Sequence, residues 1–142
     1  MAIANLHETL LTYTMRKAEI QNEISSLNAQ KMLAALEQSD VQSLLNAGKS
    51  NLRNQFREMF ENSPELQELY HDYTEIPEFE EEMEKLQAQY QEQLEELSNW
   101  ETNLDNQITT YSAELEEINA YEESLKNMLS SNIQDDFNFG LN

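Results

Sequence analysis

The 142-residue chain contains no cysteine, two glycines and two prolines. The absence of cysteine excludes disulfides, thiol catalysis and thiolate metal sites. The scarcity of helix breakers, in a sequence rich in Glu, Gln, Leu, Asn and Ser, favours long helices over sheets. A chain of this length predicts one domain. The hydrophobic fraction of 39% is below the roughly 45–50% of ordinary globular domains, so we expect its core to be small.

Long apolar runs and a leader pattern are also missing from the sequence. No stretch reaches the roughly 18 consecutive apolar residues that span a bilayer, so no membrane span is predicted. Residues 1–15 contain no basic residue ahead of an apolar run and no small-residue cleavage site. We expect a soluble protein, either cytoplasmic or exported without a cleaved signal peptide, and the sequence leaves this choice open.

Basic residues are rare in the second part of the chain, which makes the charge distribution uneven. Residues 1–60 contain six basic and six acidic side chains, whereas residues 61–142 contain two basic and 22 acidic ones, and the formal net charge is −20. Such a surface repels nucleic acid and anionic lipid, whose binding depends on Lys and Arg replacing counterions. The charge predicts no nucleic-acid partner and favours a basic or neutral protein partner.

A first long helix is predicted over residues 3–38, which contain no Gly or Pro. Apolar residues recur there every seven positions, as on an amphipathic helix. This stripe consists of Leu6, Tyr13, Ile20, Leu27, Ala34 and Val41. Two positions that would complete the seam are Lys17 and Lys31. These lysines either fix the register of the helices at some cost in stability or extend from the edge of the stripe into water.

Residues 39–76 carry several helix start and stop signals. Ser39 begins a capping-box pattern, and Gly48 is suited to end a helix. Ser63 and Pro64 are a cap followed by a first-turn proline. We expect this segment to form short helices that connect two long ones.

The longest helix is predicted over residues 78–131, where the coiled-coil pattern is strong. Its apolar residues at a spacing of seven are Met83, Tyr90, Leu97, Leu104, Tyr111, Ile118 and Leu125. Trp100 and Tyr121 flank this stripe and widen it. The apolar face is broader than a two-stranded seam requires, so we expect it to contact at least two neighbouring helices.

Together these elements predict an all-α fold, an elongated antiparallel helical hairpin or coiled coil in a single domain. Residues 1–38 form the first long helix, and residues 39–76 form the turn region, with short helices over about 41–73. Residues 77–131 form the acidic return helix, and residues 132–142 form a flexible tail.

The antiparallel arrangement also predicts ion pairs between the two long helices. The acidic residues expected near Arg16 and Lys17 are Glu114, Glu116 and Glu117. Lys31 is expected near Glu101. Pairs at a solvated rim contribute only about 0–1 kcal/mol each, so they would select the orientation of the helices more than supply stability.

No catalytic signature occurs in the sequence, and we expect a non-enzymatic protein without a cofactor. Glu68 and His71 match one Glu-x-x-His unit of carboxylate-bridged metal bundles, which require a second unit and two further glutamates. The other histidine, His7, follows Ala4 at that spacing rather than a glutamate. No metal site is therefore predicted.

Two further segments leave alternatives open. The acidic run from Glu78 to Glu84 is able to attract calcium or a basic peptide, but it has no calcium-loop turn; the alternative is a solvated helix start that complements the helix dipole. Phe137, Phe139 and Leu141 alternate with other residues near the C-terminus. They either add to a partner as a strand or docking peptide or belong to a frayed or back-folded end.

Both ends of the chain resemble a loose group of uncharacterised, helix-rich bacterial proteins. In that group a Thr-x-x-Arg-Lys unit precedes a polar helix, and Thr12 to Lys17 resemble it with one additional residue before the Arg. The group also has a Glu-rich coiled-coil helix similar to Leu115–Ile118, followed by a stretch similar to Tyr121–Lys126 and by an Asn-Ile pair like Asn132-Ile133. The resemblance implies a bacterial origin and a helical fold, and no activity.

The sequence therefore predicts a helical assembly or adaptor protein that acts through coiled-coil packing, with a protein partner or with itself as a homo-oligomer. The alternative is a leaderless accessory, chaperone-like or filament component of a bacterial specialised secretion apparatus, whose subunits similarly pair N-terminal with C-terminal helices. The residues expected to carry the interaction are Met83, Tyr90, Leu97, Trp100, Leu104, Tyr111, Ile118, Tyr121, Leu125, Phe137 and Phe139.

Overall fold

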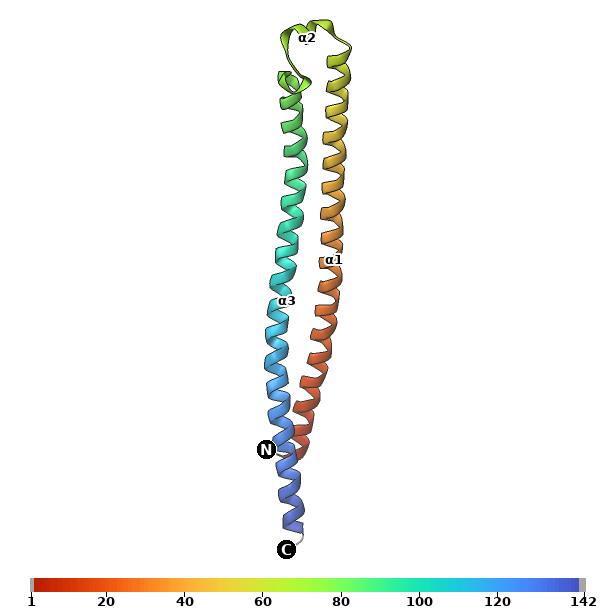
Figure 1. Ribbon diagram of the computed structural model, residues 1–142. Helices are drawn as coiled ribbons and strands as arrows, with labels where there is room; N and C mark the ends of the chain where they lie inside the picture. Colours follow the sequence, from red (N-terminus) through yellow and green to blue (C-terminus); the bar gives the residue numbers. More distant parts are fainter. Residues whose placement is uncertain (1, 141–142) are drawn as a thin grey trace. The chain divides into compact units, whose positions relative to one another are not determined.

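The computed structural model describes the backbone of residues 2–140 and the side chains of residues 2–135. The elements in chain order are α1 (Ile3–Glu61), α2 (Pro64–Leu69), the 3₁₀ helix η1 (Tyr73–Glu75) and α3 (Pro77–Gly140). Figure 1 traces the chain from α1 through the short α2 into α3. The described residues contain no strand, which confirms the predicted all-α helical hairpin.

The chain divides into two compact units, each built from a segment of α1 and a segment of α3. The first unit comprises Met1–Lys31 and Asn103–Asn142, and the second comprises Met32–Thr102. In the first unit Tyr13 stacks on Tyr121, whose ring centroid is 5.6 Å away, and Lys31 pairs with Asp105. Positions later in α1 therefore meet positions earlier in α3, so the two segments are antiparallel.

The second unit also pairs its long segments in the antiparallel sense. Gln38 of α1 donates a hydrogen bond to Glu101, and Phe56 packs against Phe79 with ring centroids 5.4 Å apart. Between these two contacts Gly48 lies against Leu86. The two segments are thus antiparallel at each of these three points.

The predicted end of the first helix near residue 38 is wrong, because α1 continues without a break to Glu61. Gly48 costs about 1 kcal/mol relative to alanine inside a helix. Leu45 and Phe56, on either side of it, are buried, and full burial of such a side chain contributes about 1.5–3 kcal/mol. Tertiary packing of the continuing apolar stripe therefore outweighs the local start signal at Ser39 and the stop signal at Gly48.

The connection between the long helices is shorter than predicted. The helix start predicted at Ser63 and Pro64 is confirmed. Ser63 is the N-cap of α2, where its hydroxyl accepts a hydrogen bond from the Leu66 N–H at 3.4 Å, and Pro64 occupies the first turn. The sequence interpretation did not include η1. Its N-cap is Asp72, whose carboxylate accepts hydrogen bonds from the Tyr73 N–H and the Thr74 hydroxyl.

A small aromatic core closes the second unit at this connection. Phe56, Ile76 and Phe79 are buried there, and Tyr73 meets Phe79 edge to face at 5.4 Å. Arg57 lies over the Tyr73 ring at the same distance, in cation–π geometry. The aromatic contacts fix the connection against both long helices of the unit.

The start of α3 at Pro77 agrees with the prediction, but its end does not. Residues 132–140, predicted as a flexible tail, continue the helix to Gly140. The sequence from 132 to 139 contains no Gly or Pro, so nothing in it stops a helix that is already formed. Leu141 lies outside the described residues.

Candidate protein-interaction surface

The stripe of α3 that was expected to bind a partner is mainly used inside the chain. Leu104 and Ile118 are buried, with 2% and 5% of their surface exposed. The remaining members of the stripe are half-buried: Met83, Tyr90, Leu97, Tyr111 and Leu125. Most of the predicted interaction residues therefore contribute to the cores of the two units.

The predicted stripe of α1 supplies the other half of these cores. Leu6, Ile20, Leu27 and Ala34 are all buried. Tyr13 is half-buried because its ring stacks on Tyr121. The spacing of seven thus identified the helix faces that pack together, but not a free binding surface.

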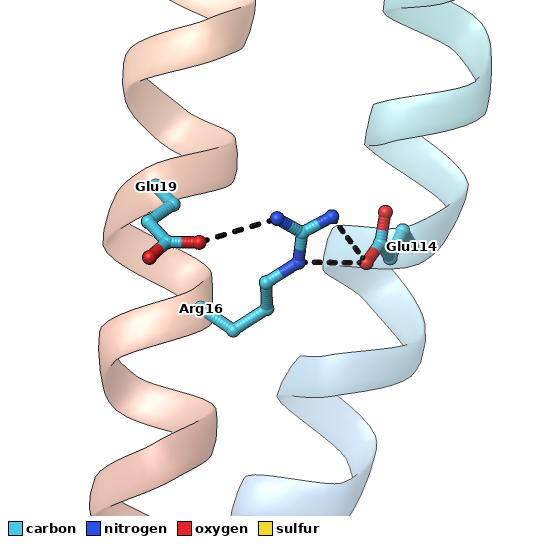
Figure 2. A network of polar contacts seen from close by, with 3 residues as sticks. All are labelled: Arg16, Glu19 and Glu114. Atoms are coloured by element: carbon cyan, nitrogen blue, oxygen red, sulfur yellow. Dashed lines mark hydrogen bonds and ion pairs between the residues drawn. The ribbon is translucent and has the colours of Figure 1, made fainter.

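Arg16 connects two glutamates across the first unit (Figure 2). Its Nε and Nη2 atoms both lie 3.0 Å from Glu114 Oε1, and Nη1 lies 3.2 Å from Glu19 Oε2. The hydrogen bonds to Glu114 and then to Glu19 raise the pKa of the Arg16 guanidinium. The predicted proximity of Arg16 and Glu114 is confirmed. Because the pair is exposed, it contributes to orientation more than to stability.

Lys17 pairs with a different acid from those predicted. Its Nζ atom lies 3.8 Å from Oε2 of Glu122, rather than beside Glu116 or Glu117. Lys126 contacts the other carboxylate oxygen of Glu122 at 3.1 Å. The sequence interpretation missed Glu122 as the partner of Lys17, and the signal was the lysine itself, because a charge in an apolar seam needs an opposite charge nearby.

Lys31 and Tyr121 also have defined polar partners in the first unit. Lys31 Nζ lies 2.6 Å from Asp105 Oδ1. The Tyr121 hydroxyl donates a hydrogen bond to Glu117 at 3.2 Å, and this bond raises the pKa of the phenol above its ordinary value of 10.0. Tyr121 is thus a half-exposed member of the predicted interaction set that is held in place by stacking and hydrogen bonding.

Large apolar side chains remain exposed on α1. In the second unit Leu33, Leu36 and Leu44 are at least half exposed, and Leu36 reaches 62%. In the first unit Leu11 and Met15 are similarly exposed. The position of these side chains outside the packed stripe leaves them available for contacts with another protein.

The second unit contains a groove whose α1 lining residues are close in sequence to the exposed leucines. Its volume is about 400 Å³, and the residues that line it come from both long helices. They are Glu37, Asp40 and Val41 of α1 and Gln93, Glu96, Leu97 and Trp100 of α3. The structure thus brings together two of the predicted interaction residues, Leu97 and Trp100, with two acids of α1 that the sequence interpretation did not include.

The C-terminal phenylalanines that were predicted to contact a partner provide no described binding surface. Phe137 and Phe139 lie on the helical backbone of α3, and their side chains are outside the described part.

His71, considered as a metal ligand, is exposed, and its backbone N–H donates a hydrogen bond to the Glu75 carboxylate. Among the described side chains no group of three or more His, Cys, Asp or Glu residues is arranged to hold a metal ion. None of the described helices combines the length and apolar content needed to cross a bilayer.

Known proteins supply no relative from which a function can be transferred. No protein-family model, curated protein sequence or solved structure matches the chain. The function must therefore be inferred from the arrangement of its own side chains.

Proposed function

We propose that this chain is a non-enzymatic helical assembly or adaptor protein that binds other proteins through helix packing of the coiled-coil type. The observation that carries the proposal is the set of exposed apolar side chains on α1 within the second unit, with Leu33 at 50%, Leu36 at 62% and Leu44 at 56% exposure. Apolar side chains gathered on one surface are typical of protein interaction sites.

The number of helices in each unit supports the same proposal. Each unit contains two long helical segments, which cover one apolar stripe on each other. The apolar face of α3 is wider than one stripe, and Tyr121 and Met128 on it remain nearly half exposed. A further helix from a partner or a second copy would bury these side chains and enlarge a small core.

The test is a site-specific photo-crosslinking experiment with the full chain in its native cell. A photoreactive phenylalanine analogue replaces Leu36, and a control carries it at Asn54, an exposed polar position of α1. The proposal expects a discrete adduct from position 36 that is absent from position 54. A compact monomer in sedimentation experiments at every concentration, together with no adduct at position 36, would contradict it.

A second candidate is an accessory, chaperone-like or filament component of a bacterial specialised secretion apparatus. The observation in its favour is that the first unit pairs the first 31 residues with residues 103–142, as subunits of such filaments pair their terminal helices. This is an analogy of fold, which is weak evidence about function. A reporter fused behind residues 1–30 should be exported by a bacterium with such an apparatus, and the same reporter behind residues 32–61 should not. Retention of both fusions would argue against this candidate.

A further inference from the structure

We propose that the groove lined by residues 37–41 of α1 and 93–100 of α3 is a docking site for a basic amphipathic helix of another protein. The inference rests on the proposed adaptor function and specifies the chemistry of the partner. We name this site the acidic groove. All of its residues belong to the second unit.

The inner part of the acidic groove is apolar and contains an aromatic anchor. Val41, Leu97 and Trp100 line it, and each of the three is partly buried but keeps some exposed surface. Amphipathic helices bind proteins by placing an apolar face into a groove of this kind. Tryptophan is one of the residue types enriched among those that dominate the binding energy of protein interfaces.

The apolar surface extends along α1 beyond the groove itself. Leu33 and Leu36 precede Glu37 and Asp40 by four residues, and Leu44 follows Asp40 by four. Residues four apart on a helix are neighbours on its surface. From Leu33 to Leu44 the strip is about 16 Å long at 1.5 Å per residue, which is about three helical turns. A partner helix of three or four turns would therefore cover it.

The edges of the acidic groove select a basic partner. Glu37 and Asp40 stand on the α1 side and Glu96 on the α3 side, while none of the lining residues is Lys or Arg. The residues of the second unit include 17 acids against four bases. Lys or Arg side chains flanking the apolar face of an incoming helix would pair with the three carboxylates. An arginine would also be able to stack on Trp100.

The same charges disfavour a second copy of this chain in the groove. A two-fold symmetric dimer places the same patch of both copies face to face. Glu37, Asp40 and Glu96 would then meet their own equivalents, and like charges at an interface are repulsive. A basic helix meets no such penalty.

The test uses the full chain and a synthetic peptide of about four helical turns, with Leu at helical positions i, i+3, i+4 and i+7 and Lys at the others. The peptide contains no aromatic residue, and Trp100 is the single tryptophan of the protein, so the fluorescence of Trp100 reports on the groove directly. We expect saturable binding with a shift of the Trp100 emission to shorter wavelength. The matched peptide with Glu in place of Lys should not bind.

Matched variants separate the groove from general charge attraction. The triple variant Glu37→Gln, Asp40→Asn and Glu96→Gln should weaken binding by about tenfold or more, because it removes three rim pairs. The control Glu8→Gln, Glu58→Gln and Glu84→Gln removes the same charge from exposed positions elsewhere. This control should bind the peptide with an affinity within about twofold of the parent protein, because salt screens charges that lie far from the binding site.

A second pair of variants tests the apolar strip. Leu36→Ser with Leu44→Ser should weaken binding by about tenfold, as expected when buried apolar contacts are lost. Leu11→Ser with Met15→Ser changes similarly exposed residues of the first unit and should leave binding unchanged. All four positions are exposed, so circular dichroism should show both variants to be folded.

Three results would overturn the inference. Equal weakening by both charge triples would show non-specific attraction, and absence of saturable binding would show that the groove takes no basic helix. A Trp100 emission shift that depends on protein concentration without peptide would show that a second copy occupies the groove. In each case a discrete crosslink from position 36 would still support the adaptor function. The adaptor function would be contradicted by a different result, a compact monomer at every concentration together with no adduct at position 36.

Discussion

Lys17 Nζ lies 3.8 Å from Oε2 of Glu122, and Glu122 is buried to the extent that only 8% of its surface is exposed. Among the described atoms this oxygen has no hydrogen-bond partner, so its interaction with Lys17 is an ion pair without a hydrogen bond. Lys126 holds the other oxygen from one turn along α3. The pair joins α1 to α3 inside a largely apolar seam and therefore favours one register of the two segments.

We expect Lys17→Met to lower the free energy of unfolding by about 1–3 kcal/mol, because the buried Glu122 carboxylate loses one of its two cationic partners. The double variant Lys17→Met with Glu122→Leu should recover most of this loss, since the buried carboxylate and its lysine partner are then both replaced by apolar side chains. Urea unfolding, monitored by circular dichroism, measures the stability of the single and the double variant. Lys85→Met is the matched control, because among the described side chains Lys85 forms only exposed pairs within α3, and it should cost less than about 0.5 kcal/mol. A loss in Lys85→Met as large as that in Lys17→Met would show that Glu122 does not need its partner.

Truncation of the buried stripe should be costly in the first unit. Ile20 and Leu104 belong to that unit and have 0% and 2% of their surface exposed. Ile20→Ala or Leu104→Ala should each lower the free energy of unfolding by about 2–4 kcal/mol through lost burial and a residual cavity. Met32→Ala, at a position that is 69% exposed, should change it by less than about 0.5 kcal/mol. Equal effects at buried and exposed positions in chemical denaturation would contradict the packing described above.

Gly48 is a position where we expect a substitution to stabilise the protein. It lies inside α1 with no positive φ, and a Cβ added there would lie 3.0 Å from Leu86 Cδ2. Leu86 is half-buried and lines a groove of about 280 Å³, so the end of its side chain has room to move. Gly48→Ala should therefore raise the free energy of unfolding by about 0.5–1 kcal/mol through helix propensity.

Gly48→Leu tests the same contact from the other direction. A longer side chain would displace Leu86 and should destabilise the second unit by about 1–3 kcal/mol through overpacking. Thermal unfolding of Gly48→Ala, Gly48→Leu and the parent protein measures these changes in stability. A loss of stability in Gly48→Ala would show that α1 and α3 approach too closely at this point for any Cβ.

Tyr121 should show a measurable pH dependence. Its hydrogen bond to Glu117 raises the pKa of the phenol in the folded state. The folded protein then holds the phenolic proton more tightly than the unfolded chain does. The resulting stabilisation is fully present below the ordinary pKa of 10.0 and is lost as the pH rises through the folded-state pKa.

Ultraviolet titration of the tyrosines detects this shift directly. The difference between the parent protein and Tyr121→Phe isolates the Tyr121 phenol, and its midpoint should lie above 10.0. Glu117→Gln removes the acceptor charge and should move the midpoint down. A midpoint that does not respond to Glu117→Gln would show that the hydrogen bond does not control Tyr121.

Much of the fold followed from local pattern. The spacing of seven from Leu6 to Ala34 and the matching stripe around Leu104 and Ile118 indicated the faces that the structure buries. Pro77 and the Ser63 cap marked helix starts correctly because capping depends on residues within one turn. The stop signal at Gly48 failed because a cost of about 1 kcal/mol in one residue is smaller than the burial gained on both sides of it.

The sequence by itself determined the helical class, the two apolar stripes and the excess of acid, because each is a property of residue type and spacing along one helix. Only the tertiary structure decided that Lys17 meets Glu122 and that Trp100 shares a groove with Glu37 and Asp40. These contacts depend on the register of one helix against another. A shift of one turn, about 5.4 Å, preserves a repeating apolar stripe nearly unchanged but exchanges the polar residues that face each other across it.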